Sequence, residues 1–254
     1  MTSTSSTSVR TGLAALCAIV ALTASTLAIA GGPAVAQPAP APPSAGAAPA
    51  TARGMTPPYA ANRKATITVR FREAVRRLHL AQETPRGYDR DKFGDWRDAD
   101  GDCRDTRAEV LVTESLRATT GDCTIETGRW FSSYDRVYWT DAGDVDIDHL
   151  VPLFEVWRSG GKAWGSARRV AYANDLADSR TLRAVTDNVN QSKGDQDPSD
   201  WMPEFGRCVY ARQYTAVKIR WNLRVNADEK NKLRRIASHC PNAVIRVHKA
   251  RVVS

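Results

Sequence analysis

The sequence predicts an α+β domain that follows an export signal and is braced by disulfide bonds. Helices are expected in 163–176, where Trp164, Ala167, Ala171 and Asp175 mark successive turns, and in 208–221 and 228–239. Residues that favour β-strands gather at 124–125 and 130–139. Four cysteines lie in the part of the chain that carries these elements. Helices, short strands and disulfides are therefore expected together in one fold.

Residues 1–36 have the composition of a secretory signal peptide. Their one charged residue is Arg10, the run from 12 to 30 is uncharged and mostly apolar, and Ala34-Val35-Ala36 fits an A-x-A cleavage site. The length of the apolar run also suits an uncleaved membrane anchor. Because many of its residues are Ala, Thr or Ser, we favour cleavage and an extracellular protein.

Residues 37–60 are rich in Pro and Ala and hold few large apolar side chains, which predicts a linker. The remaining segment, 61–254, is long enough for one domain with its own core. The whole chain has a formal net charge of +8 and a pI near 9.4. This charge suits a polyanionic partner such as nucleic acid, although many exported proteins are basic without binding one.

The cysteines predict two disulfide bonds. Cys17 would leave with the signal peptide, so that Cys103, Cys123, Cys208 and Cys240 remain. An even number in an exported protein indicates paired cysteines, and three pairings are possible. Proximity in the sequence favours Cys103–Cys123 and Cys208–Cys240. No C-x-x-C pair is present, so a four-cysteine zinc site is not expected.

Shorter segments complete the expected secondary structure. Apolar residues in 65–82 first alternate and then take helical spacing, which predicts a mainly helical segment. Residues 98–105 form an acidic turn, and 109–113 a short β-rich run. A turn at 142–144 precedes the main motif, where it suits a hairpin, and the apolar residues 182–185 lead into a helix.

The main motif is Asp148-His149, which is followed about forty residues later by Asn190-x-x-Lys193-Gly194. A carboxylate can hold a divalent cation while the adjacent imidazole takes a proton from water. The amide of Asn190 can supply a second oxygen ligand, and Lys193 can meet the charge of a phosphate. The alternatives are a polar pair at the end of a strand and a helix cap. The ordered set favours phosphodiester hydrolysis.

The flanking residues extend this motif into a family resemblance. They are Gly87-Tyr88-Asp89-Arg90, Trp96, the stretch Cys103 to Leu111, Trp157, and Thr186 to Asp195. With these residues the chain, from 87 to 221, resembles the HNH (His-Me finger) endonucleases. It is most similar to their secreted actinobacterial branch, which is related to the GmrSD C-terminal domain.

This resemblance implies a ββα-metal core and assigns roles to the motif residues. His149 would be the general base, and Asp148 and Asn190 would hold one Mg²⁺ or Mn²⁺ ion. Lys193 would stabilise the phosphate. Asp146 would share a strand face with Asp148. It is an additional metal ligand, a hydrogen-bond acceptor behind the metal ligands, or an ordinary loop acid. The implied substrate is DNA, with RNA as an alternative, and the implied products carry 5′-phosphate and 3′-hydroxyl ends.

The residue that orients His149 is left open. Related nucleases have an Asn nine residues before the ligand Asn, and here that position is Thr181. Asn174 or Asn188 could take its place. This departure leaves a second hypothesis: an inactive or weakly active extracellular module that binds nucleic acid or another polyanion on the same fold.

Three arginines are candidates for binding phosphate, namely Arg107, Arg180 and Arg183. Arg107 could instead form a structural pair with Glu109. Apart from nucleic acid, we expect no partner: the mature protein should be a monomer without membrane attachment.

An acidic stretch partly matches a calcium-binding loop. Asp98, Asp100, Asp102 and Glu109 occupy positions one, three, five and twelve of an EF-hand loop. Cys103 replaces the glycine that makes the sharp turn at position six. We therefore do not expect Ca²⁺ at this loop.

Overall fold

The computed structural model describes residues 66–250. The expected signal peptide (1–36), the expected linker (37–60) and the segments 61–65 and 251–254 lie outside the described residues. The described part combines helices and short strands with two disulfide bonds, which confirms the α+β prediction. Within residues 66–250, no helix has the length and apolarity needed to cross a membrane.

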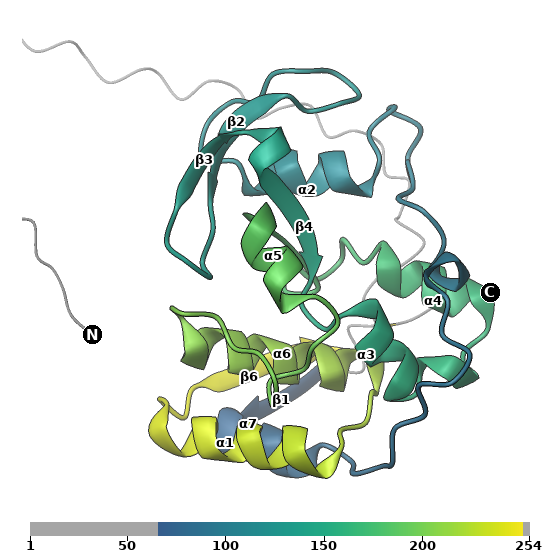
Figure 1. Cartoon of the computed structure of the whole chain (residues 1–254), viewed down its shortest axis with the longest axis vertical. Helices are drawn as coiled ribbons and strands as arrows, with labels where there is room; N and C mark the ends of the chain where they lie inside the picture. The colour runs from purple at the N-terminus through teal and green to yellow at the C-terminus, as the bar shows by residue number, and fades with distance from the viewer. Residues whose placement is uncertain (1–65, 251–254) are drawn as a thin grey trace, which may run out of the picture. The chain divides into compact units, whose positions relative to one another are not determined.

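The strands form three separate two-stranded antiparallel sheets (Figure 1). They pair as β1 (Thr66–Arg70) with β6 (Val244–His248), β2 (Thr127–Phe131) with β3 (Tyr138–Asp141), and β4 (Val145–His149) with β5 (Leu182–Thr186). The β1–β6 pair joins the two ends of the described chain. β4 runs through the middle of the molecule and ends at the Asp148-His149 motif.

The C-terminal helices pack with α1 (Phe71–Arg77) to form the lower layer in Figure 1. They are α6 (Arg207–Trp221) and α7 (Ala227–His239), and both confirm the predicted helices. The side chain of Asn226 caps α7 by accepting a hydrogen bond from the backbone N–H of Glu229. The Cys208–Cys240 disulfide joins the start of α6 to the end of α7.

Four shorter helices surround the motif: α2 (Thr106–Glu114), α3 (Leu153–Arg158), α4 (Ser166–Ala173) and α5 (Asp187–Lys193). Helix α4 confirms the expected helix in 163–176, at a shorter length. The strand expected at 109–113 is wrong, because α2 covers it. Asp105 caps α2 through the backbone N–H of Ala108, and Ala108 and Leu111 face the core at helical spacing.

Two other expectations are corrected in part. The segment 65–82 is not mainly helical, since its alternating residues form β1 before α1 begins. Residues 142–144 do form a turn, the short 3-10 helix η3 (Ala142–Asp144), but the strands on its two sides do not pair. β4 instead pairs with β5, far along the chain. The second predicted disulfide, Cys103–Cys123, is present and ties down the loop before α2.

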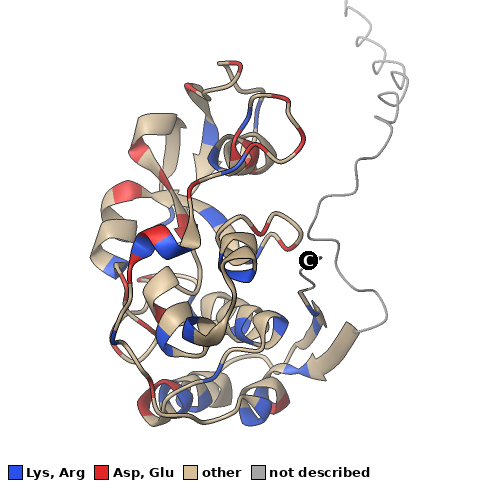
Figure 2. Ribbon diagram, turned by 90° about the vertical axis from the view of Figure 1, so that its right-hand side faces the viewer, with Lys and Arg blue, Asp and Glu red and all other residues tan. Residues whose placement is uncertain are grey.

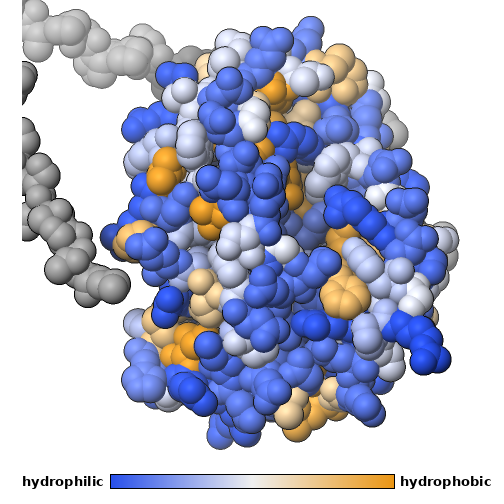
Figure 3. All heavy atoms as spheres, in the orientation of Figure 1, coloured by the Kyte–Doolittle hydropathy of each residue, from blue (hydrophilic) through white to orange (hydrophobic). Residues whose placement is uncertain are grey.

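The buried apolar residues form two clusters, and the motif lies between them. Leu150 and Val151 belong to the larger cluster around α6, whereas Val145 and Ile147 belong to a smaller one that also holds residues of α2 and β5. His149 therefore lies where the two clusters meet. On the surface, apolar residues occur as small separate patches on a largely hydrophilic face (Figure 3).

Candidate active site

A hairpin followed at once by a helix positions the motif residues. β4 and β5 pair in a register that places Asp148 opposite Arg183 and His149 opposite Leu182. Helix α5 begins directly after β5 and packs against both strands. It ends at Gly194, whose φ of 50° lies in the left-handed region that favours glycine. This short helix holds Asn190 and Lys193 over the end of β4.

His149 is fixed on three sides. Its Nε2 lies 2.9 Å from the backbone carbonyl oxygen of Ala173. Its ring lies between Trp96, nearly parallel at 7° with centroids 5.2 Å apart, and Tyr172, with centroids 5.9 Å apart. A carbonyl oxygen only accepts hydrogen bonds, so Nε2 carries the proton and Nδ1 keeps its lone pair.

Burial keeps this imidazole neutral. Loss of solvent lowers the pKa of His149 to about 3, and the positive charges of Arg90 and Lys193 act in the same direction. The hydrogen bond to Ala173 opposes the shift. A neutral imidazole with a free Nδ1 can accept a proton.

The Asp148 carboxylate is buried and held at both oxygens. Lys193 Nζ donates to Oδ1 at 2.6 Å, and the Tyr134 hydroxyl donates to Oδ2 at 2.6 Å. Lys193 also donates to the backbone oxygen of His149 at 3.0 Å. Burial and the neighbouring Asp148 charge raise the pKa of Tyr134 well above its usual value, so Tyr134 stays a donor. A carboxylate has further lone pairs, which leaves room for another ligand.

Asp146 and Asn190 form the next part of the site. Asn190 Nδ2 donates to Asp146 Oδ2 at 3.1 Å, which leaves the amide oxygen of Asn190 available as a ligand. Both residues line a cavity of about 330 Å³ together with Asp148 and His149. Carboxylate and amide oxygens are the ligands that Mg²⁺ accepts, so this donor set fits a magnesium or manganese ion.

Two arginines add positive charge to the same cavity. Arg107 lines it, and its guanidinium is held by the carbonyl oxygens of Ala142 and Val145 at 2.9 and 2.8 Å. No Arg107–Glu109 ion pair occurs among residues 66–250. Arg90 lines this cavity and a second one of about 200 Å³, and His149 and Trp96 also line both. Both guanidinium groups are suitable for a phosphate.

The other candidate residues lie elsewhere. Lys193 does not face the cavity as a phosphate contact would, since its ammonium is buried against Asp148. Thr181 donates to Asp175 at 2.8 Å, and Asn174 accepts from Thr106 at 2.7 Å. Within residues 66–250, neither side chain is hydrogen-bonded to the His149 ring, whose partner is the Ala173 carbonyl.

The remaining two arginines do not line the motif cavity either. Arg180 is paired with Asp178 at 2.5 Å. Arg183 donates to Ser133 at 3.2 Å and lines a different cavity.

Four groups of the site are not evident from the motif alone: Tyr134, Trp96, Arg90 and the Ala173 carbonyl. Trp96 and Arg90 occur in the flanking stretches that extend the motif. The Ala173 carbonyl leaves no trace in the sequence, because every residue has one. Tyr134 reaches Asp148 only through the fold.

The acidic loop before α2 does gather its carboxylates. Ligand oxygens of Asp98, Asp100 and Asp102 lie within 4.8 Å of one another on the exposed surface, and Glu109 is not among them. Asp98 accepts hydrogen bonds from the backbone of Gly101 and Cys103 within the loop. These contacts help to fix the conformation of the loop.

Comparisons with known proteins identify the family of the chain. Residues 90–236 match the family model of the GmrSD restriction endonucleases, C-terminal domain. A protein described as an uncharacterized secreted protein, from the fungus Arthroderma benhamiae, is 43% identical over 157 residues, which cover 61% of this chain and 76% of that protein. No solved structure matches the chain. The chain belongs to the family of GmrSD restriction endonuclease C-terminal domains.

Proposed function

We propose that this protein is a secreted, metal-dependent endonuclease of the HNH (His-Me finger) type that hydrolyses phosphodiester bonds of DNA, with RNA as an alternative substrate. The observation that carries the proposal is the placement of His149. Its Nε2 is held by Ala173, and it lines one cavity with Asp146, Asp148 and Asn190. Family membership independently favours nuclease activity.

In the proposed reaction, His149 Nδ1 accepts a proton from the attacking water while Ala173 holds the opposite side of the ring. Asp148 and Asn190, with Asp146 as a third candidate, would hold one Mg²⁺ or Mn²⁺ ion. When bound, this ion would neutralise negative charge on the phosphate and on the leaving oxygen. Arg107 and Arg90 would bind the non-bridging phosphate oxygens and align the scissile bond.

Lys193 and Tyr134 would position Asp148 without touching the substrate. Both donate to its carboxylate, and Lys193 also reaches the backbone at His149. The unit of β4, β5 and α5 would correspond to the ββα-metal core of such nucleases.

The inactive-module hypothesis rested on Thr181 in place of an orienting Asn. The Ala173 carbonyl makes the contact to the His149 ring that Thr181 does not make, and this contact supports the proposal of an active enzyme. Two disulfides favour export, since such bonds persist in oxidising compartments. A monomeric state stays a prediction.

The test is incubation of supercoiled plasmid with the purified mature protein, with Mg²⁺ and with EDTA. We expect nicking and linearisation with Mg²⁺ and none with EDTA. Binding of plasmid without cleavage under either condition would favour the inactive-module hypothesis.

A further inference from the structure

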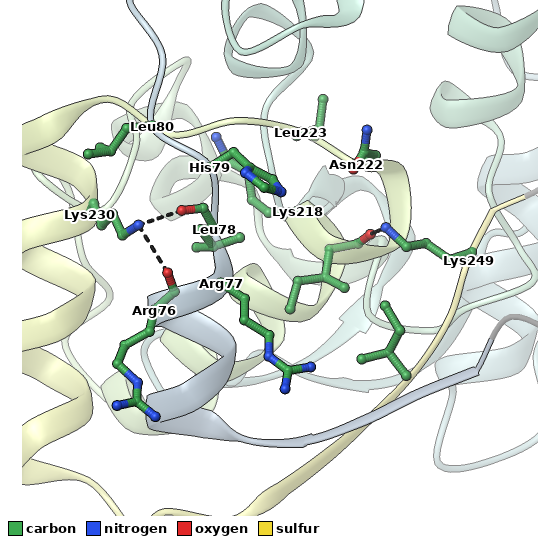
Figure 4. A pocket seen from close by; sticks show the side chains of 12 residues that line it. Arg76, Arg77, Leu78, His79, Leu80, Lys218, Asn222, Leu223, Lys230 and Lys249 are labelled. Atoms are coloured by element: carbon green, nitrogen blue, oxygen red, sulfur yellow. Dashed lines mark hydrogen bonds between the residues drawn. The ribbon is translucent and has the colours of Figure 1, made fainter.

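One large cavity of the described chain is lined by ammonium groups that already donate hydrogen bonds to neighbouring backbone carbonyls. It has a volume of about 570 Å³ and lies at the C-terminal ends of α1 and α6 (Figure 4). Lys230 donates to the backbone oxygen of Arg76, and Lys249 donates to that of Ile219. Carbonyls at a helix C-terminus carry negative partial charge, so these ammonium groups complement the helix ends. This cavity is therefore a poor site for an anion.

A different cavity, of about 290 Å³, is lined by polar side chains with buried atoms that lack a hydrogen-bond partner. It lies between the loop that joins β2 to β3 and the start of α6, where the backbone N–H of Phe205 donates to the carbonyl of Tyr134 at 3.1 Å. Aromatic rings of Phe131, Tyr134 and Phe205 line it, with Arg183 and Gln213. Small-molecule sites begin at roughly 300 Å³, so this volume suits one nucleotide-sized group.

One side chain, Tyr134, connects this cavity to the proposed metal ligand Asp148. The ring of Tyr134 lines the cavity, while its hydroxyl donates to Asp148. Arg183 lines the same cavity and stands opposite Asp148 in the β4–β5 pair. A group bound here would belong to a nucleotide near the bond that is cut.

Three polar atoms of the residues that line this cavity are buried without a partner. Arg183 Nε, Gln213 Oε1 and the Tyr210 hydroxyl have no hydrogen-bond partner within the described range 66–250. Buried polar groups are nearly always paired, because leaving one unpaired costs free energy. The arginine nitrogen is a donor, the glutamine oxygen is an acceptor, and the tyrosine hydroxyl can act as either. The edge of a nucleobase carries both acceptors and donors, so it suits this set of atoms.

The rings and charges around these atoms suit nucleic acid. Phe131 is 40% exposed, and the Arg136 guanidinium lies 4.5 Å from the ring centroid of Phe205. Of the described residues that line the cavity, none is Asp or Glu. Aromatic faces next to arginines bind unstacked bases and their phosphates. An anionic, heteroaromatic ligand is thus favoured over a neutral one.

We propose that this cavity is a subsite that holds one unstacked nucleobase of the substrate strand, next to the cleavage site. The proposal rests on the nuclease function proposed above and adds a preference for strands that are single or locally opened. The base would stack between the aromatic rings, and its edge would pair with Arg183 and Gln213.

The test uses fluorescein-labelled single strands of about ten nucleotides, each with one abasic position placed differently along the strand. Binding to the mature protein is measured by anisotropy in EDTA, so that no metal-dependent cleavage occurs. One abasic position should weaken binding about tenfold, which is the scale of losing one base-stacking contact.

The variants Gln213→Leu and Phe131→Leu should abolish this position dependence. Gln213→Leu removes a buried atom that lacks a partner, so it should leave the melting temperature unchanged or raise it. Weaker binding by that variant would then not result from misfolding. Gln82→Leu, at an exposed glutamine that lines another cavity, is the matched control and should bind as the wild type does.

Equal costs at every abasic position, or a position effect that persists in both variants, would overturn the subsite. If the wild type cleaves plasmid but shows no position effect, the subsite proposal is contradicted and the proposed nuclease function is kept. A position effect without plasmid cleavage would keep the subsite and contradict the proposed nuclease function.

Discussion

Lys193 and Asp148 form a buried ion pair at the centre of the candidate site. Lys193 Nζ lies 2.6 Å from Asp148 Oδ1, and both side chains are almost wholly removed from solvent. The lysine comes from α5 and the aspartate from β4, so the pair also fastens the helix to the hairpin. Lys193 therefore sets the position of a proposed metal ligand, a structural role that differs from the phosphate contact expected from the motif.

Replacing this lysine should destabilise the fold. Lys193→Met leaves the Asp148 carboxylate buried without its counter-charge, and breaking such a pair costs about 3–5 kcal/mol. Because Asp148 also lines the open cavity, we expect a loss of about 3 kcal/mol in the free energy of unfolding, measured by urea titration. The exposed pair of Arg77 and Glu73 provides the control Arg77→Met, which should cost at most about 1 kcal/mol. Unchanged stability with weaker DNA binding would restore the phosphate role of Lys193.

Asn190 should determine metal affinity. Its amide oxygen is available at the cavity, because its amide nitrogen donates to Asp146. Asn190→Ala should raise the Mg²⁺ concentration for half-maximal cleavage by about tenfold or more, since Mg²⁺ is bound through few protein ligands. Asn188→Ala, at an exposed residue of the same helix, is the control. An identical Mg²⁺ midpoint for Asn190→Ala and wild type would show that Asn190 is no ligand.

Glu229 should make stability depend on pH. Burial raises its pKa from 4.5 to about 8, with Lys218 opposing the shift and Glu155 adding to it. Between these values the folded protein keeps a proton that the unfolded chain releases, so the free energy of unfolding should fall as pH rises from about 4.5 to about 8.

Urea midpoints across this range would measure the effect. Glu229→Gln carries no titrating group and should flatten the decline, whereas Glu126→Gln, at an exposed acid, should not. A stability that rises with pH in the wild type would contradict the shift assigned to Glu229.

Salt should strongly inhibit cleavage, with little dependence on sequence. The chain has a net charge of +8, and Figure 2 shows lysine and arginine spread over many of its helices. Arg90 and Arg107 line the candidate site. Contacts to phosphate release counterions, so affinity falls steeply as salt rises. Cleavage of several unrelated duplexes across a salt series is the measurement. One preferred site, cut equally at low and high salt, would instead indicate direct readout of bases.

The sequence motif predicted which residues of the candidate site lie on one cavity, but it did not predict the contacts among them. Asp148 and His149 are adjacent in the chain, and a short helix places Asn190 on the same cavity, so their approach was predictable from the motif. The contact of the Ala173 carbonyl with His149 was not predictable, because every residue has a backbone oxygen and the sequence does not show which one is used. The burial of Lys193 depends on how α5 docks on β4, which is a tertiary effect.

In the fold, too, some elements were predictable from local sequence patterns and others depend on tertiary contacts. The one-sided spacing of apolar residues in α7 can be read from the sequence, whereas α6 is buried around most of its circumference and has no such pattern. Residues 109–113 contain Val and Thr, which favour strands, yet the Asp105 cap and burial of Leu111 make them part of α2. The pairing of β4 with β5 spans two intervening helices, and local patterns carry no information about it.

The central claim is that His149 is the general base, and one variant tests it most directly. The rate of Mg²⁺-dependent plasmid cleavage should be measured for wild type, His149→Ala and the control His79→Ala, at an exposed histidine outside the site. We expect His149→Ala to lose about 10²–10⁴-fold in rate, with the fold and DNA binding retained, and His79→Ala to match the wild type. Cleavage by His149→Ala at a rate near that of the wild type would show that another group takes the proton.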